Sequence, residues 1–532
     1  MAKKSDFSFI ASLATVARST PDKTALFEPA ASRRKVHHRQ FTFRQLEDDS
    51  TAIAAALWQK GIKKGDHVFF LVPPGYSLFV LVTACLKLGA VSVFADPAMG
   101  IKNILHCMEL AKPKLFVSIG ISHLFRIMHR VFRKIPLQMS IGFSLVPAMN
   151  YKKILNQFQQ AVFHPRHYNE KDPVMITFTS GSTGVPKGAL RTYEFIMEQN
   201  RVISDTLNYA QDEIELSNLP LFILNNIANN IASVIPAVRS LSSLDAKLLF
   251  CQIERTAVTH ITASPALFRK LSAYCLSEQK SLPRITKIFT GGGPVDVPLL
   301  KQMKKCFPHA KITVVYGSTE AEPISHIEAD RAIDAALKNN RGFCVGKPIR
   351  QVKVKILPLG NDFLHNKKIP VLPALETGEI IVTGNHVNKA YYKNKKAEAA
   401  CKITDVAGEI WHRTGDTGFF DASGRLWLTG RVQDAIYRKN EIFHPFEIEQ
   451  KVQELDFIER GAAVGMPDDF MTNRLRLVVE LKKQVPLKKE SLQTKISDFL
   501  KMYPVDEILF VKKIPLDKRH NTKILYHRLR EM

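Results

Sequence analysis

The chain has 532 residues, of which 45% are hydrophobic and 23% are charged, and it carries a formal net charge of +25 at pH 7. This composition excludes an intrinsically disordered protein, and the length exceeds what one hydrophobic core usually holds, so at least two domains are expected. The seven cysteines form no Cys-x-x-Cys pair, which argues against a zinc site and a disulfide framework and fits a reducing cytosol.

The excess of positive charge would suit nucleic acid or an anionic lipid surface as a partner. A nucleic-acid module is not predicted, because the sequence has neither zinc-finger spacing nor an aromatic ribonucleoprotein signature. Residues 123–135 place apolar side chains on one helical stripe and basic side chains elsewhere, which predicts a basic amphipathic helix. Such helices more often pack against their own domain, so the sequence leaves open only a weak peripheral contact with a membrane.

Residues 1–170 show strands alternating with helices. A strand at residues 67–72 ends at two prolines and a glycine. The most apolar window, residues 78–95, contains Lys87 and Gly89, and we interpret it as a buried helix followed by a strand rather than as a membrane span. The alternation predicts an α/β fold with mainly parallel sheets and with ligands at the carboxyl ends of the strands.

A stretch rich in glycine and hydroxyl side chains follows an apolar strand at residues 174–176. Glycines let backbone N–H groups approach an anion, hydroxyls add donors, and a lysine adds a point charge, so we expect a cradle for polyphosphate. The spacing is not that of the P-loop, because Pro186 stands where that motif needs its second glycine. The predicted phosphate-binding residues are Thr179, Ser180, Gly181, Ser182, Thr183, Gly184 and Lys187.

Another strand ends at residues 219–222, and the side chains around its end are apolar or amides. We interpret Phe222, Ile223 and Asn225 as the wall of an acyl pocket. His260 lies in an apolar strand, where a buried core histidine is more frequent than a catalytic one.

Two further stretches suit a nucleotide. Residues 288–295 form a strand and a glycine turn, whose backbone could lie flat against a planar ring. In residues 314–320, Tyr316 can stack on adenine, and Glu320 can hold Mg²⁺, which prefers hard oxygen ligands. The predicted residues on the adenine side are Gly291, Gly292, Gly293, Tyr316 and Gly317.

The order of these stretches resembles the acyl-adenylate-forming superfamily of AMP-dependent synthetases and ligases, which includes acyl-CoA synthetases, luciferases and peptide-synthetase adenylation domains. Residues 316–320 match its Tyr-Gly-x-Thr-Glu motif, and residues 411–416 match its [Trp/Tyr]-x-[Arg/Lys]-Thr-Gly-Asp motif. Residues 514–524 match its final lysine motif, which contains Lys523. The resemblance covers essentially the whole chain.

The resemblance implies a large N-terminal AMP-binding domain at residues 1–430, made of two α/β subdomains with mainly parallel sheets and a small β subdomain that begins at Glu376. It implies a hinge at residues 431–434. A small, mobile α+β domain, residues 435–532, would follow as a lid that carries the catalytic lysine.

Roles for single residues also follow from the resemblance. Thr319 would donate to the α-phosphate, Glu320 would hold Mg²⁺, and Lys523 would bridge the incoming carboxylate and the α-phosphate. Asp416 would bind the two ribose hydroxyls, and Arg431 the ribose and phosphate. The implied reaction is attack of a carboxylate on the α-phosphorus of ATP, which gives an acyl-adenylate and pyrophosphate. ATP and Mg²⁺ are therefore the predicted cofactors.

Within the superfamily, the chain most resembles the branch of bacterial olefin biosynthesis that closes β-hydroxy fatty acids to β-lactones. The stretches that carry this likeness are residues 96–100, residues 220–222 without a following histidine, residues 411–413 and residues 517–524. In that chemistry the hydroxyl of the substrate attacks the activated carbonyl and AMP leaves, so CoA is not needed. Asn440 agrees with this, because thioester-forming relatives have there a glycine that lines the pantetheine tunnel.

Three other functions stay open at this point. The protein could be a long-chain fatty acid-CoA ligase, a fatty acyl-AMP ligase that loads a carrier protein, or a degenerate protein that only binds nucleotide. The predicted partner is a fatty acid, and the use of CoA is undecided. The basic N-terminus lacks the apolar run of a signal peptide, which predicts a cytoplasmic protein with at most a peripheral contact to a membrane surface.

Overall fold

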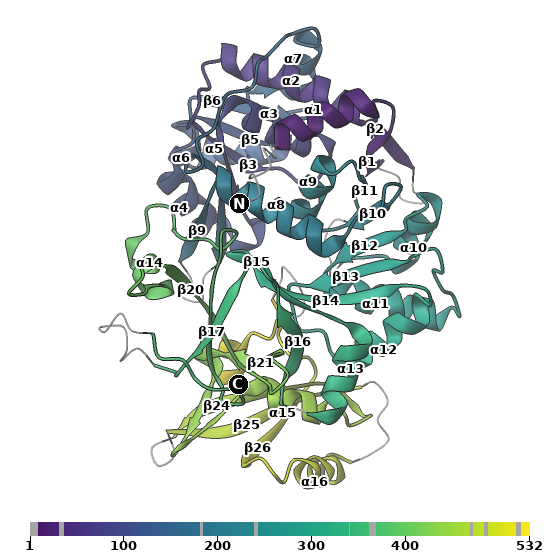
Figure 1. Ribbon diagram of the computed structural model, residues 1–532, viewed down its shortest axis with the longest axis vertical. Coiled ribbons are helices and arrows are strands. Elements are labelled where there is room, and N and C mark those ends of the chain that lie inside the picture. The colour runs from purple at the N-terminus through teal and green to yellow at the C-terminus, as the bar shows by residue number, and fades with distance from the viewer. Residues whose placement is uncertain are drawn as a thin grey trace.

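The computed structural model describes residues 9–30, 37–180, 185–238, 243–339, 341–360, 369–468, 472–482, 488–517 and 523–532. In these ranges helices and strands alternate through most of the chain, which confirms the predicted α/β class (Figure 1). Two large sheets form the upper and middle parts of the molecule in this view, and the C-terminal residues form a smaller unit below them.

The first sheet has, within the described residues, seven strands in the order β7-β6-β5-β3-β4-β8-β9. These are β3 (His67–Leu71), β4 (Val91–Ala95), β5 (Leu115–Ile119), β6 (Leu137–Ile141), β7 (Met149–Asn150), β8 (Pro173–Ser180) and β9 (Pro186–Thr192). All neighbouring pairs are parallel except β8 and β9, which form a hairpin. The carboxyl ends of β5, β6 and β8 therefore lie along one edge of the sheet.

Helices cover both faces of this sheet, because its central strands are apolar on both sides. The helices of this region are α1 (Phe9–Ser19), α2 (Phe43–Gln59), α3 (Tyr76–Leu88), α4 (Ile101–Ala111), α5 (Phe125–Met128), α6 (Arg130–Arg133) and α7 (Tyr151–Gln157). On β3, Val68 and Phe70 belong to the core shared with α2 and α3, whereas Phe69 belongs to the core shared with α4. The apolar window at residues 78–95 forms most of α3 and all of β4, so the expected buried helix and strand are confirmed.

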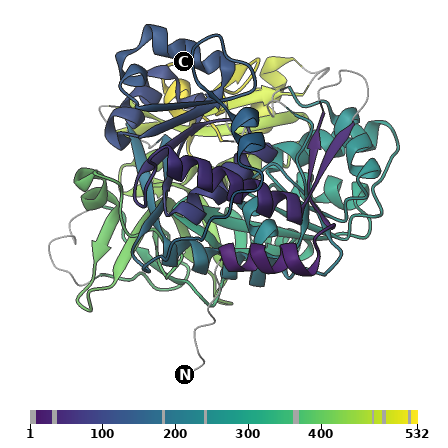
Figure 2. The same ribbon diagram turned by 90° about the horizontal axis from the view of Figure 1, so that it is seen from above.

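The second sheet has fourteen strands within the described residues, in the order β17-β18-β20-β21-β16-β15-β14-β13-β12-β10-β11-β1-β2, with β19 paired to β20. The strands are β1 (Thr24–Pro29), β2 (His38–Thr42), β10 (Ile214–Ser217), β11 (Ala232–Val234), β12 (His260–Ala263), β13 (Lys287–Gly291), β14 (Lys311–Ser318), β15 (Ala321–Glu328), β16 (Phe343–Pro348), β17 (Lys353–Leu357), β18 (Gly378–Thr383), β19 (Lys402–Thr404), β20 (Ile410–Phe420) and β21 (Leu426–Arg431). Neighbours are parallel along the stretch β14-β13-β12-β10-β11-β1. The pair β1–β2 is antiparallel, and so are β14–β15 and the pairs beyond it. The N-terminal hairpin of β1 and β2 (purple in Figure 2) closes one edge beside strands from the middle of the chain.

Seven helices of the described chain accompany this sheet or connect it to the first one. They are α8 (Tyr193–Leu207), α9 (Pro220–Ala228), α10 (Ala246–Arg255), α11 (Pro265–Ser277), α12 (Val297–Cys306), α13 (Ala329–Lys338) and α14 (Lys395–Cys401). Side chains of α10, α11 and α12 share one hydrophobic core with β12, β13 and β14. Helices α8 and α9 supply residues to the core of the first sheet, so they join the two sheets.

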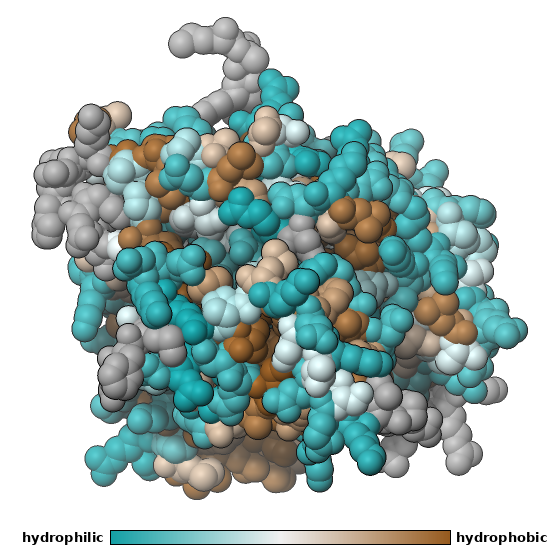
Figure 3. Space-filling view, turned by 90° about the horizontal axis from the view of Figure 1, so that it is seen from below, coloured by the Kyte–Doolittle hydropathy of each residue, from teal (hydrophilic) through white to brown (hydrophobic). Residues whose placement is uncertain are grey.

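Residues 436–532 build a core of their own after a short 3₁₀ turn at Val432–Asp434. Their elements are β22 (Ile436–Arg438), β23 (Glu441–Phe443), α15 (Pro445–Val452), β24 (Ile458–Asp468), β25 (Thr472–Leu481), α16 (Lys489–Phe499), β26 (Val505–Val511) and α17 (Tyr526–Arg530). The ring of Phe446 lies 5.3 Å from that of Phe343, which joins α15 to the second sheet. Seen from below, hydrophilic residues cover most of the molecular face (Figure 3).

The prediction of one amphipathic helix at residues 123–135 is wrong. The segment is divided into a 3₁₀ turn, α5 and α6, with extended backbone at His129 between the two helices. The break lets Phe132 reach the core with 0% exposure, while Ile127 and Met128 remain 66% and 70% exposed. One continuous helix would have kept Met128 and Phe132, which are four residues apart, on the same stripe. Among the described residues, no helix is both long and apolar enough to cross a membrane.

Candidate active site

The predicted phosphate loop lies between β8 and β9. The hairpin pairs Thr179 with Lys187 next to the predicted loop, and residues 181–184 of that loop lie outside the described residues. Gly188 follows the lysine, and a Cβ there would lie 2.9 Å from the ring of Phe178. The two strands therefore pack closely where the predicted loop leaves the sheet.

Three of the predicted nucleotide residues come together from different strands. The Tyr316 hydroxyl donates to Asp416 Oδ2 at 2.8 Å, and Arg431 Nε lies 3.0 Å from Asp416 Oδ1. Burial, together with the neighbouring Asp416 charge, raises the pKa of Tyr316 well above its usual value, and Asp416 also raises the pKa of Arg431. The Tyr316 ring is thereby held in one orientation beside a carboxylate that faces both a phenol and a guanidinium group.

The glycine turn lies next to this group. Gly291 ends β13 opposite Val315 of β14, and a Cβ on Gly291 would lie 2.3 Å from the Val315 carbonyl oxygen. Gly292 has a φ of 79°, which side chains other than glycine rarely adopt. The turn formed by Gly291, Gly292 and Gly293 therefore packs closely against β14, the strand that carries Tyr316, and this packing needs glycine at Gly291 and Gly292.

Glu320 sits in the hairpin between β14 and β15 and contacts residues that sequence reasoning missed. The Tyr391 hydroxyl donates to Glu320 Oε1 at 3.1 Å, and the backbone N–H of Asn388 donates to the Glu320 carbonyl oxygen at 2.6 Å. Burial would raise the pKa of Glu320, but neighbouring charge and the Tyr391 hydrogen bond outweigh it and lower this pKa. Burial lowers the pKa of His412 to about 3, so near pH 7 the positive charge beside Glu320 comes from Lys402.

Lys402 connects Glu320 to the phosphate loop. Its Nζ donates to the Asn388 carbonyl oxygen and lies 5.1 Å from the centre of the Tyr391 ring. Lys187 Nζ lies 5.9 Å from the same ring centre and 3.4 Å from Cys401 Sγ. Burial lowers the pKa of Lys402 to about 8. Two lysines thus share one tyrosine whose hydroxyl binds the predicted metal ligand.

An apolar cavity lies between the two sheets, lined mainly by side chains of α1, α3, β8, α8 and α9 and by the amides of Gln199, Asn200 and Asn225. Its volume of about 30 Å³ accommodates a hydroxyl group or a water molecule, so an acyl chain needs the lining side chains to move. Of the predicted pocket wall, Asn225 lines this cavity. Phe222 packs instead with Phe289, and Ile223 belongs to the core of the first sheet.

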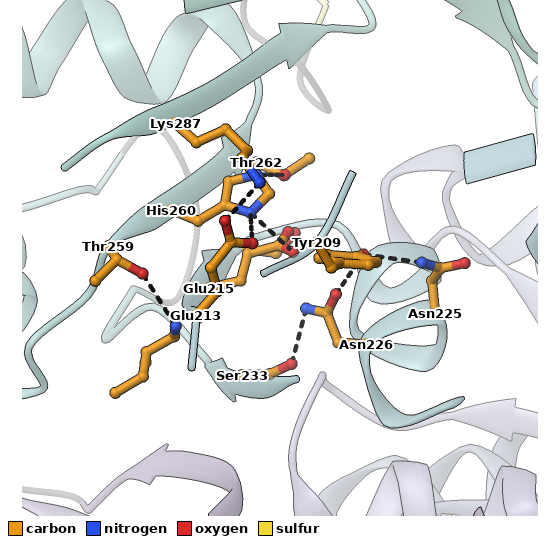
Figure 4. Close-up of polar contacts among 12 residues, drawn as sticks. Tyr209, Glu213, Glu215, Asn225, Asn226, Ser233, Thr259, His260, Thr262 and Lys287 are labelled. Carbon is orange, nitrogen blue, oxygen red and sulfur yellow. Dashed lines mark hydrogen bonds and ion pairs between the residues drawn. The ribbon is translucent and has the colours of Figure 1, made fainter. Parts of the chain in front are cut away.

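A chain of hydrogen bonds fixes the orientation of Asn225 (Figure 4). Tyr209 donates its single hydroxyl proton to Asn226 Oδ1 at 2.6 Å, so its oxygen accepts from Asn225 Nδ2 at 2.8 Å. Asn226 in turn donates to Ser233 Oγ at 3.0 Å. The amide nitrogen of Asn225 therefore faces Tyr209 and its oxygen points away. No described residue donates to this oxygen, although Asn225 is only 2% exposed.

Gln199, which lines the same cavity, repeats this pattern. Its Nε2 donates to the carbonyl oxygen of Glu322 at 3.4 Å, two residues after Glu320. Among the described residues, none donates to Gln199 Oε1. The amide nitrogens of Asn225 and Gln199 thus donate to other groups, whereas no described residue donates to their oxygens. The cavity therefore offers acceptors for a hydroxyl donor.

His260 is buried, as expected for a core histidine. Its Nδ1 lies 3.4 Å from Glu213 Oε2 and 3.8 Å from Glu215 Oε2, and the side chain is 0% exposed. These groups lie on the side of Tyr209 opposite to Asn225 (Figure 4). They support the position of Tyr209 but do not line the cavity.

The structure places Lys523 on an exposed turn of the C-terminal unit. Its backbone N–H donates to Asp517 Oδ1 at 2.8 Å, and its carbonyl oxygen accepts from the Asp517 N–H at 2.9 Å. Residues 518–522 lie outside the described residues. Asn440 lies in the turn between β22 and β23, after Lys439 with a φ of 52°.

A family model and curated proteins match most of the chain. The family model described as AMP-binding enzyme matches residues 13–392. An olefin beta-lactone synthetase from Stenotrophomonas maltophilia is 28% identical over 97% of this chain and 96% of its own length. A 2-succinylbenzoate–CoA ligase from Bacillus cereus is 24% identical over 85% of this chain and 84% of its own length.

Solved structures share the fold. An amide bond synthetase from Marinactinospora thermotolerans superimposes with a TM-score of 0.80 at 19% identity, over 98% of this chain and 99% of its own. An o-succinylbenzoate CoA synthetase from Bacillus subtilis, in complex with ATP and magnesium ion, gives 0.75 at 20% identity, over 97% and 98%. The family model covers more than half of the sequence, and the relatives are named as ligases and synthetases. This chain therefore belongs to the AMP-binding enzyme family and is an adenylate-forming ligase.

Proposed function

We propose that the protein activates a long-chain β-hydroxy fatty acid with ATP and Mg²⁺ and then closes the acyl-adenylate to a β-lactone. The observation that supports this substrate is the buried Asn225 oxygen, to which no described residue donates, in an apolar cavity. Another residue that lines this cavity, Gln199, donates to the carbonyl oxygen of Glu322, close to Glu320. An apolar cavity suits an acyl chain, and a fixed acceptor within it suits a hydroxyl on that chain. The similarity to an olefin beta-lactone synthetase supports the same product.

In the first step, a carboxylate oxygen attacks the α-phosphorus and the bond to the bridging oxygen breaks, so that pyrophosphate leaves. Two anions must meet, and positive charge must therefore be placed around the phosphates. Lys187 and Lys402 would supply this charge at the β- and γ-phosphates, and Thr319 would donate to the α-phosphate. The C-terminal unit would rotate about residues 431–434 to bring Lys523 between the carboxylate and the α-phosphate.

Glu320 is the residue proposed to hold Mg²⁺. Among the described residues, no group of three or more His, Cys, Asp or Glu side chains could hold a metal on its own. One carboxylate fits Mg²⁺ nevertheless, because this ion keeps several waters and takes other ligands from phosphates. When bound, the ion would neutralise phosphate charge. Tyr391 and Lys402 would keep Glu320 ionised and oriented.

The remaining predicted residues would bind the nucleoside. The Tyr316 ring would stack on adenine, and Asp416 would exchange part of its present contacts for the ribose hydroxyls. The glycine turn and Gly317 would leave room for the base. Arg431 would contact ribose and phosphate from the first residue of the proposed hinge.

In the second step, the β-hydroxyl oxygen attacks the acyl carbonyl carbon, the bond to AMP breaks, and the hydroxyl proton passes to water. No CoA takes part in this step. Asn440 supports this, because thioester-forming relatives have a glycine at that position. The alternative function is a fatty acid-CoA ligase, which the similarity to a 2-succinylbenzoate–CoA ligase favours.

Mass spectrometry of the products separates these two functions. We expect ATP, Mg²⁺ and a long-chain β-hydroxy fatty acid to give AMP, pyrophosphate and a product lighter than the acid by one water. Adding CoA should not change the product. A thioester formed only with CoA would instead establish the ligase, and an acyl-adenylate that accumulates until a carrier protein is added would indicate a carrier-loading enzyme.

Replacing Asn225 by leucine should remove the preference for hydroxylated acids. We expect the ratio of kcat/KM for a β-hydroxy fatty acid to that for the unsubstituted acid of equal length to fall about tenfold, because one buried hydrogen bond is lost. Pyrophosphate release measures both values. Leu224→Met, which alters the same cavity without touching the acceptor, should change both values alike. An unchanged ratio in Asn225→Leu would mean that this oxygen binds only a structural water.

A further inference from the structure

Two loops at one edge of the first sheet expose large apolar side chains. Ile121, Ile127 and Met128, which lie in the 3₁₀ turn and in α5 of the connection after β5, are 72%, 66% and 70% exposed. Phe143 and Leu145, which follow β6, are 81% and 77% exposed. Single exposed apolar residues are common, but five such side chains on neighbouring loops mark an interaction surface.

The two loops form one surface, because β5 and β6 are parallel neighbours and pair Ile119 with Ile141 just before the loops begin. A Cβ on Gly120 would overlap the Phe143 carbonyl oxygen at 1.6 Å, so the second loop lies directly on the first. The Arg126 guanidinium of the first loop also donates to the Pro147 carbonyl oxygen of the second. We call the five exposed side chains with these loops the β5–β6 surface.

The segment of the chain that carries the β5–β6 surface has charged side chains of one sign only. Residues 110–169 contain no aspartate or glutamate, although the whole chain has 50. The same sixty residues contain nine lysines and arginines. Of these, Arg130, Arg133 and Lys134 are exposed in and just after α6, beside the apolar side chains (α5 and α6 in Figure 1). No side chain of this segment can neutralise them.

We propose that the β5–β6 surface docks on an anionic lipid bilayer. Exposed apolar side chains would enter the boundary between head groups and acyl chains, while the basic side chains contact anionic head groups. A second copy of this chain fits less well, because symmetrical contact would bring two basic surfaces together. The docking needs no long amphipathic helix, since the apolar side chains come from the 3₁₀ turn and the short helix α5 after β5 and from the loop after β6.

The β5–β6 surface lies at the same edge of the sheet as the predicted phosphate loop, so docking would bring the adenylation site close to the membrane. Strands β5, β3, β4 and β8 are successive parallel neighbours, so the exposed loops and the start of the predicted phosphate loop share one edge of the sheet. Three strand spacings separate β5 from β8, roughly 15 Å. A docked protein would hold its adenylation site close to the lipid in which long-chain acids dissolve. The docking itself is independent of the proposed reaction.

Vesicle flotation with the full-length protein tests the proposal. We expect binding to vesicles of phosphatidylcholine with phosphatidylglycerol and at least about tenfold weaker binding to phosphatidylcholine alone. Phe143→Ser/Leu145→Ser and, separately, Arg130→Gln/Arg133→Gln should each weaken binding to the anionic vesicles by at least about tenfold. The matched control is Leu337→Ser/Val406→Ser, whose parent side chains are 73% and 78% exposed elsewhere and should leave binding unchanged.

Three results would overturn the proposal. They are no binding of the wild type to anionic vesicles, equal losses in the control variant, and a self-association that the Phe143→Ser/Leu145→Ser variant abolishes while vesicle binding persists. Adenylation of a short, water-soluble acid should be equal in all variants. That measurement shows that they are folded and keeps a failure of docking distinct from a failure of the reaction.

Discussion

Lys523→Ala should lower kcat for acyl-adenylate formation at least about a hundredfold, while the KM for ATP changes less than about threefold. The reason is that the proposed contact of Lys523 with the carboxylate and the α-phosphate becomes strongest in the transition state. Negative charge gathers between the carboxylate and the α-phosphorus as their bond forms, so a bridging ammonium group stabilises the transition state more than the bound substrates. Pyrophosphate release at saturating fatty acid measures the effect.

The control is Lys513→Ala, which removes an exposed lysine from the same C-terminal unit and should keep full activity. Lactone release from synthetic acyl-adenylate should also survive in Lys523→Ala, because that step needs no attack on phosphorus. Adenylation by Lys523→Ala within about threefold of the wild type, equivalent to roughly 0.7 kcal/mol, would show that this lysine does not bridge the reactants.

Glu320→Gln should lower kcat for the same step by about a hundredfold and raise the Mg²⁺ concentration needed for half-maximal activity. Glutamine keeps the shape and the acceptor for Tyr391 but removes the charge that attracts the ion. Tyr391→Phe should have a smaller effect, about fivefold, because the carboxylate remains and loses only one hydrogen bond. Rates measured across a Mg²⁺ titration separate the two variants.

Glu328→Gln serves as the matched control, since Glu328 ends the strand that Glu320 precedes and pairs with Lys311 at the surface. It should leave the Mg²⁺ dependence unchanged. If Glu320→Gln lowers the rate without any shift in that dependence, the carboxylate acts on something other than the metal.

The sequence predicted the fold class well because its signals were local. Apolar runs between turns identified β3, β4 and β13, and the motif at residues 314–320 lies on one hairpin whose neighbours in space are also neighbours along the chain. Three residues that the motifs predict to bind the nucleotide also contact one another in the structure. Tyr316, Asp416 and Arg431 meet because β20 and β21 pair Asp416 with Arg431.

The parts that escaped prediction depend on register and orientation. Lys402 reaches Glu320 only because β19 pairs it with His412 of β20, and no pattern around Lys402 indicates that pairing. The Asn225 oxygen is an acceptor because Tyr209 donates its single hydroxyl proton to Asn226 and accepts from the Asn225 nitrogen. This arrangement depends on contacts between side chains that no sequence pattern indicates. At residues 123–135, helical spacing could not reveal that Phe132 and Met128 face in opposite directions, towards core and solvent.

The hairpin of β1 and β2 has a consequence for how the nascent chain folds on the ribosome. Strand β1 pairs with β11, which is synthesised about two hundred residues later, a delay on the order of 10–40 s at ordinary elongation rates. Until then, β1 has one open side that any other strand or a chaperone could occupy. Contacts between such distant segments also slow folding. Yield during expression should therefore respond more to synthesis rate and chaperone supply than to changes in the later, locally paired strands.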